Sequence, residues 1–325
     1  MTLSATFRQH PLHLLPVVAM FMVTYHAIVM RMVGDWNFDP NYSHGFLVPC
    51  LSLWFAWVRW PELREVEVRP SAWGLGLLAA GLFLLVVGSV LIELFTSRAS
   101  LVVLMMGTVL FLYGREAFRI LLFPLAYLLF MIPLPYTVYD ALALPLKGLV
   151  SFAATGGIKL LGLPVLREGN VIIFPNITLE VVDACSGLRS IMSLAALGTA
   201  FAFLFLPAGW RRWTLVLATV PIAVATNTLR VFVTGVLSWY FGKDAASGFF
   251  HDFEGLVVFA VAMGLTAVLG FVLARVGRAA RPGTGTRPAG DTTGPGAGPD
   301  TKPGAGQDDH DHDRRNGTGG GAHVG

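Results

Sequence analysis

Long runs of apolar residues, separated by short charged loops, constrain the fold of this chain more than any other feature. Of its 325 residues, 54% are hydrophobic and only 13% are charged, whereas soluble domains carry about 25% charged residues. A helix that crosses a bilayer needs about 20 apolar residues, and about eight runs approach that length. The sequence therefore predicts an all-α polytopic membrane protein with about eight transmembrane helices. The predicted segments are 13–33, 44–58, 71–95, 99–113, 120–132, 187–206, 213–240 and 251–274.

The distribution of positive charge between these segments predicts their orientation. The net charge is only +3, and the arginines lie in loops, which indicates membrane topology rather than nucleic-acid binding. One set of loops is rich in arginine, and the other contains the acidic pair Asp35 and Asp39. The positive-inside rule therefore places the arginine-rich loops and both termini in the cytoplasm. The arginine-rich regions are Arg8, 59–69, 115–119, 211–212 and 275–287, and the outer regions are 34–43, 133–184 and 241–250.

The outer stretch 133–184 is long enough to hold structure of its own. Residues 140–163 have a moderately apolar helical pattern, which predicts an interfacial or re-entrant helix lying against the bundle. β-branched residues on both sides of Pro175-Asn176 then predict a small hairpin of residues 171–174 and 177–182.

The composition changes near residue 277. Beyond it the chain is rich in Gly, Pro and Asp and nearly free of apolar residues, so that it cannot bury enough surface to fold. We therefore predict a transmembrane domain, 1–276, and a disordered cytoplasmic tail, 277–325. The run Asp308–Asp313, with its Asp and His residues, could bind a metal weakly, but its composition favours a solvated tail. No metal site and no cofactor are expected.

The octapeptide 183–190, Asp-Ala-Cys-Ser-Gly-Leu-Arg-Ser, joins the predicted hairpin to the sixth apolar segment. Its Cys185 is one of two cysteines, too few for a disulfide framework. Ser186 can cap a helix, and Gly187 allows close approach of another backbone. A helix N-terminus favours the thiolate form of a nearby thiol. Cys185 is therefore a candidate nucleophile, although free cysteines are also commonly small buried apolar residues.

Two further polar residues are predicted at the depth of Cys185. Arg230 lies about 25 Å along the seventh segment from Trp213, at about 1.5 Å per residue, and so near the outer boundary of a core about 30 Å thick. His251 opens the eighth segment on the same side. Taken singly, Arg230 could snorkel to headgroups and His251 could be an ordinary helix-start residue. Together with Cys185 they form a set suited to acyl transfer, with a nucleophile, a proton carrier and an oxyanion-binding cation.

Three more residues are candidates for supporting roles. Asn227 lies one helical turn before Arg230 and could orient it. Arg189 lies one turn after Cys185 and could lower the pKa of the thiol. His44 is also predicted on the outer side and is an alternative proton carrier.

With these residues the chain resembles the exosortases and archaeosortases, polytopic cysteine enzymes of transpeptidase type. The resemblance covers residues 10–275, and its strength lies in several short motifs that occur in order. These are ACSGLR at 184–189, NTLRV at 227–231, HDFEG at 251–255, YSHGFLVP at 42–49 and FMIPLP at 130–135.

The resemblance implies a function and partners. It implies Cys185 as the nucleophile, Arg230 as the sortase-like arginine and His251 as the proton-transfer residue, at the outer face of the cell (inner) membrane. The implied substrates are membrane-anchored exported proteins whose C-terminal sorting signal has a short Pro-containing motif, a transmembrane helix and a basic tail. The implied product passes to water, to an envelope amine or to a glycolipid.

Two readings from other functional classes stay open at this point. A transporter or channel could line its path with Arg230 and His251. A non-catalytic membrane scaffold for envelope polysaccharide assembly would need none of the three residues. Acylation of Cys185 by a substrate peptide would distinguish an enzyme from a transporter and from a scaffold.

Overall fold

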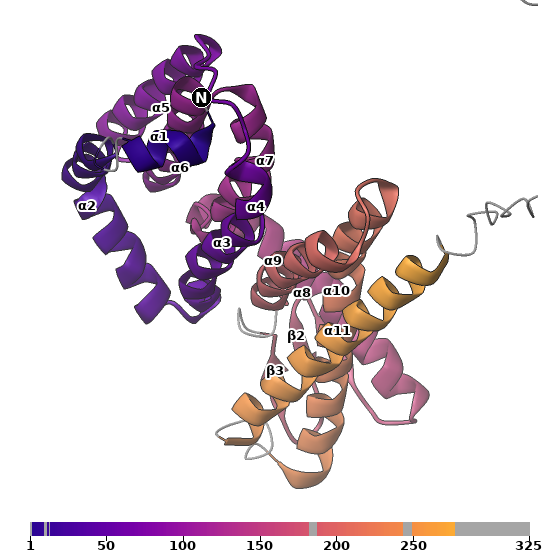
Figure 1. Cartoon of the computed structure of the whole chain (residues 1–325). Helices are drawn as coiled ribbons and strands as arrows, with labels where there is room; N and C mark the ends of the chain where they lie inside the picture. Colours follow the sequence, from indigo (N-terminus) through magenta and orange to yellow (C-terminus); the bar gives the residue numbers. More distant parts are fainter. Residues whose placement is uncertain (1, 10–11, 13, 182–186, 243–248, 277–325) are drawn as a thin grey trace, which may run out of the picture. The chain divides into compact units, whose positions relative to one another are not determined.

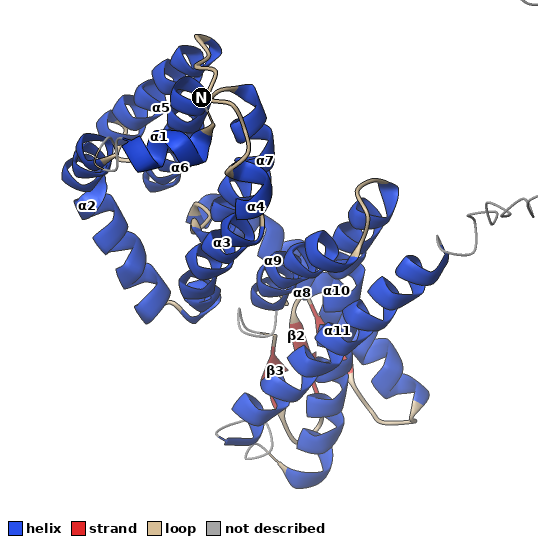
Figure 2. Cartoon of the chain, in the orientation of Figure 1, coloured by secondary structure: helices blue, strands red, loops and turns tan. Residues whose placement is uncertain are grey.

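The computed structural model describes residues 2–9, 12, 14–181, 187–242 and 249–276, with backbone alone for residues 7 and 249–254 (Figure 1). Its elements are almost all helical (Figure 2). The helices are α1 Leu3–Gln9, α2 Leu15–Phe38, η1 Pro40–Phe46, α3 Leu47–Val58, α4 Trp60–Leu63, α5 Trp73–Val90, α6 Leu94–Tyr113, α7 Arg115–Tyr127, η2 Leu128–Met131, α8 Tyr136–Leu160, α9 Leu188–Phe205, α10 Trp210–Phe241 and α11 Phe249–Val276. The strands are β1 Leu166–Glu168, β2 Val171–Ile173 and β3 Thr178–Glu180.

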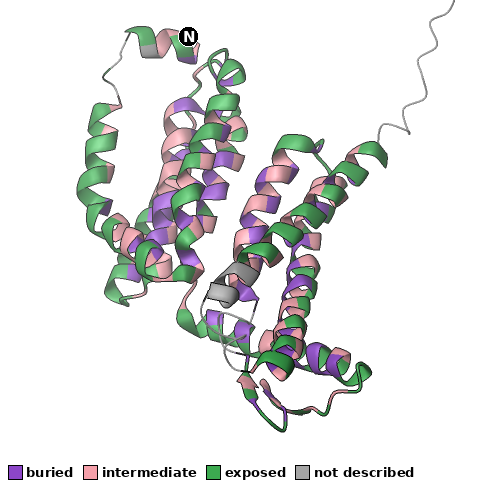
Figure 3. Ribbon diagram, turned by 90° about the horizontal axis from the view of Figure 1, so that it is seen from below, coloured by how far each residue is buried: buried purple, intermediate pink, exposed green. Residues whose placement is uncertain are grey.

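The prediction of an all-α polytopic membrane protein is confirmed. Within the described residues, seven helices are long and apolar enough to cross a membrane: α2, α5, α6, α8, α9, α10 and residues Gly255–Val276 of α11. Large apolar side chains are exposed along these helices, as lipid-facing surfaces require (Figure 3).

The set of candidate membrane-spanning helices differs from the eight predicted segments at three places. The predicted second and fifth segments form the short helices α3 and α7, of 12 and 13 residues. A new short helix with Pro61 in its first turn follows α3, and α7 passes into the 3-10 helix η2 after Tyr127. Conversely, α8 has 25 residues and qualifies by length and hydropathy. Its interfacial placement stays a prediction.

The predicted boundary between the third and fourth segments was wrong. The sequence placed the turn at residues 96–98, but α5 ends at Val90 and α6 begins at Leu94. The Glu93 carboxylate caps α6 by accepting hydrogen bonds from the backbone N–H groups of Phe95 and Thr96, at 2.9 and 2.6 Å. Arg98 therefore lies inside the helix, where it is buried and paired with Asp35 of α2.

Glycines allow α5 and α6 to pack backbone against backbone. The buried residues of α5 are Gly74, Gly81 and Gly88, spaced by seven on one face. A Cβ atom at Gly74 would overlap the backbone of Phe111, and one at Gly88 would lie 2.6 Å from the Ser97 nitrogen. Such small-residue seams are the usual way in which helices associate in lipid, where apolar contact alone gives no preference for another helix.

Aromatic side chains join α3, α7 and α9. Phe55 lies within 5.4 Å, centroid to centroid, of the rings of Phe123, Tyr127 and Phe203. The Tyr127 hydroxyl donates to the Ala196 carbonyl at 3.1 Å. This cluster fixes α9, which begins the candidate site, against the N-terminal helices.

The predicted hairpin is confirmed, and a third strand extends it. The antiparallel sheet has the order β1-β2-β3, with Ile172 opposite Leu179. It packs on the last part of α10, where the Phe174 and Trp239 rings are 5.8 Å apart and the Asn176 amide donates to the Trp239 carbonyl. At 32 residues α10 is about 48 Å long, longer than the hydrocarbon core, so one helix supports both α9 and the sheet.

The glycine seam gives the first testable prediction. Gly74→Ala should lower the free energy of unfolding by about 1–3 kcal/mol, because the new methyl group overlaps the backbone of Phe111. Gly76→Ala is the matched control on the same helix, since no atom lies within 4 Å of its Cβ position. Thermal melting of both purified variants in detergent measures the effect, and equal melting temperatures would contradict the seam.

Candidate active site

The described part of the site forms where the start of α9, the middle of α10 and the start of α11 meet. Element η1 closes it on the side of α9. Each contact joins segments that are far apart in the sequence, and each is set by a small residue or a hydrogen bond.

Gly187 brings the start of α9 against α10. Its φ of 81° lies in the left-handed region, which glycine adopts without strain. A Cβ atom there would lie 3.0 Å from the side-chain nitrogen of Asn227, which is only 1% exposed. Both the conformation and the close contact require glycine, so the ACSG motif ends at a position that only this residue fits.

Cys185 lies outside the described residues, which stop at 181 and resume at Gly187. Gly187 is the first described residue after Cys185 in the sequence, and its contact with Asn227 is where this part of the chain meets α10.

Arg230 lies one turn beyond Asn227 on α10 and is half-buried. α11 crosses it at Gly255, where a Cβ atom would lie 3.5–3.6 Å from the guanidinium carbon and its two Nη atoms. His251 lies four residues before Gly255 in the backbone of α11, on the same face of the helix. Its side chain lies outside the described atoms.

The structure thus brings two of the predicted residues, Asn227 and Arg230, to the crossing points of α10 with its neighbours. Asn227 meets the segment that carries Cys185, and Arg230 meets the helix that carries His251. The joint role of Cys185, Arg230 and His251 remains a prediction from the sequence.

Arg189 binds η1. Its Nε donates a hydrogen bond to the Asn41 side-chain oxygen at 3.0 Å, and the Asn41 backbone N–H donates to the Asp39 carboxylate at 2.9 Å. Asp39, Asn41 and Arg189 thus connect the end of α2 to the first turn of α9. The predicted influence of Arg189 on the Cys185 thiol is a separate question that this contact does not address.

His44 packs on the next turn of α9. Because α3 begins at Leu47, His44 lies in η1, ahead of the helix. Its Nδ1 is 3.5 Å from the Ser193 hydroxyl. Burial lowers the pKa of His44 below its usual value, against the opposing effect of the Phe130 and Asn41 carbonyl groups. Burial therefore favours the neutral form of His44, the form that can accept a proton.

Asn41 and Ser193 are site residues that sequence reasoning missed. Each has a partner about 150 positions away, at separations of 148 and 149 residues, so no local pattern could reveal them. Arg31, which lies outside this site, was also passed over, although an arginine inside an apolar run is a visible signal. Among the described residues, no group of three His, Cys, Asp or Glu side chains could hold a metal ion.

Fold and site together define a polytopic helical membrane protein with a polar centre between its C-terminal helices. The family described as transmembrane exosortase (Exosortase_EpsH) matches residues 36–268. The chain belongs to the transmembrane exosortase family, as the sequence predicted. No curated protein and no solved structure matches the chain.

Proposed function

We propose that this protein is a membrane cysteine peptidase or transpeptidase that cleaves C-terminal sorting signals of exported proteins. Membership of the transmembrane exosortase family supports the class of protein. The observation that carries the proposal further is the meeting of Gly187 with Asn227 and of Gly255 with Arg230, next to two motif residues that can perform acyl transfer.

The proposed reaction has two steps. The Cys185 thiolate attacks the carbonyl carbon of the scissile peptide bond, and the carbonyl oxygen becomes an oxyanion that the Arg230 guanidinium stabilises. His251 donates a proton to the leaving amine, which departs with the transmembrane helix and basic tail of the substrate. A second amine, or water, then loses a proton to His251 and attacks the thioester, releasing the thiolate.

Asn227 is suited to a positioning role in this scheme. Its side chain is buried between Gly187 and α10, one turn from Arg230. The Arg230 carbonyl also accepts a hydrogen bond from the Thr234 hydroxyl at 2.9 Å. The backbone at Arg230 is thus held in a regular helix while its guanidinium reaches α11.

His44 remains the alternative proton carrier. It contacts α9 through Ser193, and the burial that lowers its pKa favours the neutral form, which suits the proton-accepting step. The proposal assigns proton transfer to His251 because His251 and Gly255 share the face of α11 that crosses Arg230.

We also propose, with α3 and α7 as short spans and α8 as an interfacial helix, that the site faces outward, across the cell (inner) membrane from both termini. The arginine-rich loop that contains Arg64 supports this orientation. Reporter fusions at Arg64 should give a cytoplasmic signal, and fusions at Asp140 an external one. An external signal at Arg64 would reverse the assignment.

The chemical proposal predicts that Cys185→Ala and Cys185→Ser both abolish cleavage, because neither side chain gives a thiolate near neutral pH. Arg230→Lys should lower turnover about 10²–10³-fold, since lysine lacks the planar fork. His251→Ala should lower it about 10²–10⁴-fold. Cleavage of a tagged sorting-signal protein in membranes measures all of these.

Three controls make the series interpretable. Each variant must reach the wild-type level in the membrane. His44→Ala should retain measurable turnover. Wild-type protein with substrate should form a hydroxylamine-sensitive acyl adduct on Cys185. Continued cleavage by Cys185→Ala would overturn the assignment and favour a transporter or a scaffold.

The crossing of α11 over Arg230 predicts the effect of a variant that alters no catalytic group. Gly255→Leu should displace the guanidinium and lower turnover about 10²-fold, the cost of roughly 1 Å of misplacement. Gly264→Leu adds the same side chain to the same helix at an exposed position with no atom within 4 Å of its Cβ, and should leave turnover unchanged. Equal rates in the two variants would mean that Arg230 does not act from this position.

A further inference from the structure

Helix α2 packs loosely on α5 and α6 and leaves two apolar cavities beside it. It is exposed along most of its length, with only 11% of its spanning window buried (Figure 3). Each cavity has a volume of about 570 Å³, one between α2 and α6 and one between α2, α5 and α6. Both are lined by Val17, Phe21, Tyr25 and Thr108. We call this region the α2 seam.

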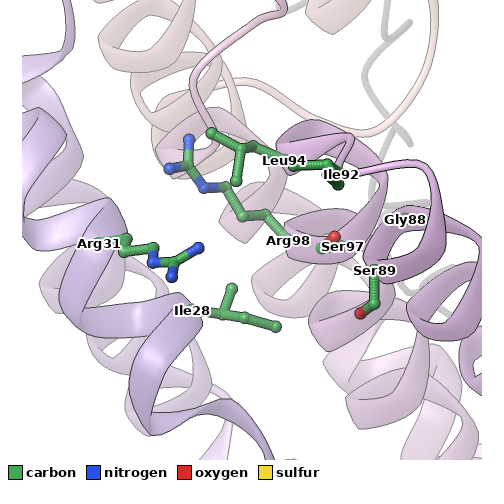
Figure 4. A pocket seen from close by; sticks show the side chains of 8 residues that line it. All are labelled: Ile28, Arg31, Gly88, Ser89, Ile92, Leu94, Ser97 and Arg98. Atoms are coloured by element: carbon green, nitrogen blue, oxygen red, sulfur yellow. The ribbon is translucent and has the colours of Figure 1, made fainter.

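A third, polar pocket lies at the Asp35 end of the α2 seam. Its volume is about 180 Å³, and Figure 4 shows the side chains of Arg31, from α2, and Arg98, from α6, at the space between the two helices. The hydroxyl groups of Ser89 and Ser97 also line it. Two guanidinium groups and the Ser89 hydroxyl are donors suited to the oxygens of a phosphate group, whereas the Ser97 hydroxyl already donates to the Glu93 carbonyl at 2.8 Å.

Some of the N–H donors in this pocket have no acceptor among the described residues. Arg98, only 3% exposed, binds the Asp35 carboxylate through Nη2, and its Nε has no hydrogen-bond partner among the described residues. Glu93 is the other nearby carboxylate, and it is used in capping α6. No carboxylate of the described chain lies within 4 Å of Arg31. Asp35 and Glu93 together equal the two arginines in charge, but the Arg31 guanidinium and the Arg98 Nε keep N–H donors that no carboxylate of the described residues accepts.

The polar pocket and the apolar cavities follow one another along the same pair of helices. On α2, Arg31 of the pocket is adjacent to Met30 of the cavity, and on α6, Arg98 is one turn from Leu101. From Leu14 to Arg31 the seam is about 25 Å long, so the chains of a lipid from one leaflet, about half of the 30 Å core, fit in the part of the seam nearest the pocket. A cationic end and an apolar body in this order match a lipid with a phosphate headgroup.

We propose that the α2 seam binds an anionic membrane lipid, with its phosphate on Arg31 and Arg98 and its acyl chains in the two apolar cavities. The lipid fills the space that α2 leaves beside α5 and α6. The proposal does not depend on the enzymatic activity, because it rests on residues outside the candidate active site.

Lipid retention by the full-length protein tests this proposal. The protein is placed in nanodiscs of equal parts phosphatidylglycerol and phosphatidylcholine, extracted in mild detergent, and its bound lipids are counted by native mass spectrometry. Wild type should retain phosphatidylglycerol in preference. Arg31→Gln should lower that preference about fivefold, the loss expected for one arginine at a lipid phosphate. Arg64→Gln, an exposed arginine of the loop after α4, makes the same charge change and should have no effect.

Two further variants separate the headgroup from the chains. Arg98→Gln should also lower the preference, and because it breaks the pair with Asp35, its thermal stability is measured alongside. Thr108→Phe places a larger side chain at a position that lines both apolar cavities, leaves the arginines intact, and should reduce retention of both lipids. Arg31 makes no ion pair in the described chain, so its variant keeps the proposal testable if the Arg98 variant fails to fold.

Three results would overturn the proposal. If wild type and Arg31→Gln showed the same preference for phosphatidylglycerol over phosphatidylcholine, Arg31 would not select the anionic lipid. If millimolar inorganic phosphate removed the bound phosphatidylglycerol, so that the protein retained no lipid, the pocket would be a site for soluble phosphate. The third result uses a photo-reactive amino acid in place of Met22, which lines the seam. If this residue crosslinked to a single-span sorting-signal peptide and not to lipid, the seam would hold a substrate helix.

Discussion

Close approach between helix backbones is the interaction on which the rest of this structure depends. Apolar surface gives helices in lipid no reason to prefer one another, so packing must come from contacts that lipid cannot make. Glycine provides such contacts: Gly74 lies against the backbone of Phe111, and Gly235 and Gly198 make room for the side chains of Ile158 and Thr219 on neighbouring helices. In the candidate site Gly187 lies against the Asn227 side chain of α10, and Gly255 of α11 faces the Arg230 guanidinium at an ordinary contact distance.

Polar groups add direction to this packing. The Arg98–Asp35 pair joins α6 to the end of α2, and the Arg189–Asn41 hydrogen bond joins α9 to η1. In a low-dielectric surrounding an unpaired charge is costly, so each contact defines one relative position of two helices. Asp35 and Asn41 lie on either side of the short connection from α2 to η1. The contact of α6 with Asp35 and the contact of α9 with Asn41 therefore hold the same short piece of chain.

The candidate site and the α2 seam make opposite use of space. Around Asn227 and Arg230 the helices are so close that any side chain larger than hydrogen meets its neighbour at Gly187. Along α2 the helices stand apart and leave cavities of about 570 Å³. A rigid centre is suited to holding catalytic groups, and an open seam facing the bilayer is suited to a molecule that enters from the membrane.

The sequence by itself determined the membrane class, most apolar helices, the hairpin around Asn176 and the family. These are local properties, because a helix in lipid satisfies its own backbone hydrogen bonds and must be apolar over its length. Tertiary structure decided the rest. The boundary before Arg98 depended on Glu93 capping and on Asp35, sixty-three residues away. The partners of Arg189 and His44, and the crossing of Gly255 over Arg230, depend on which helices pack together, and a pattern of apolar residues along one helix does not encode its neighbour.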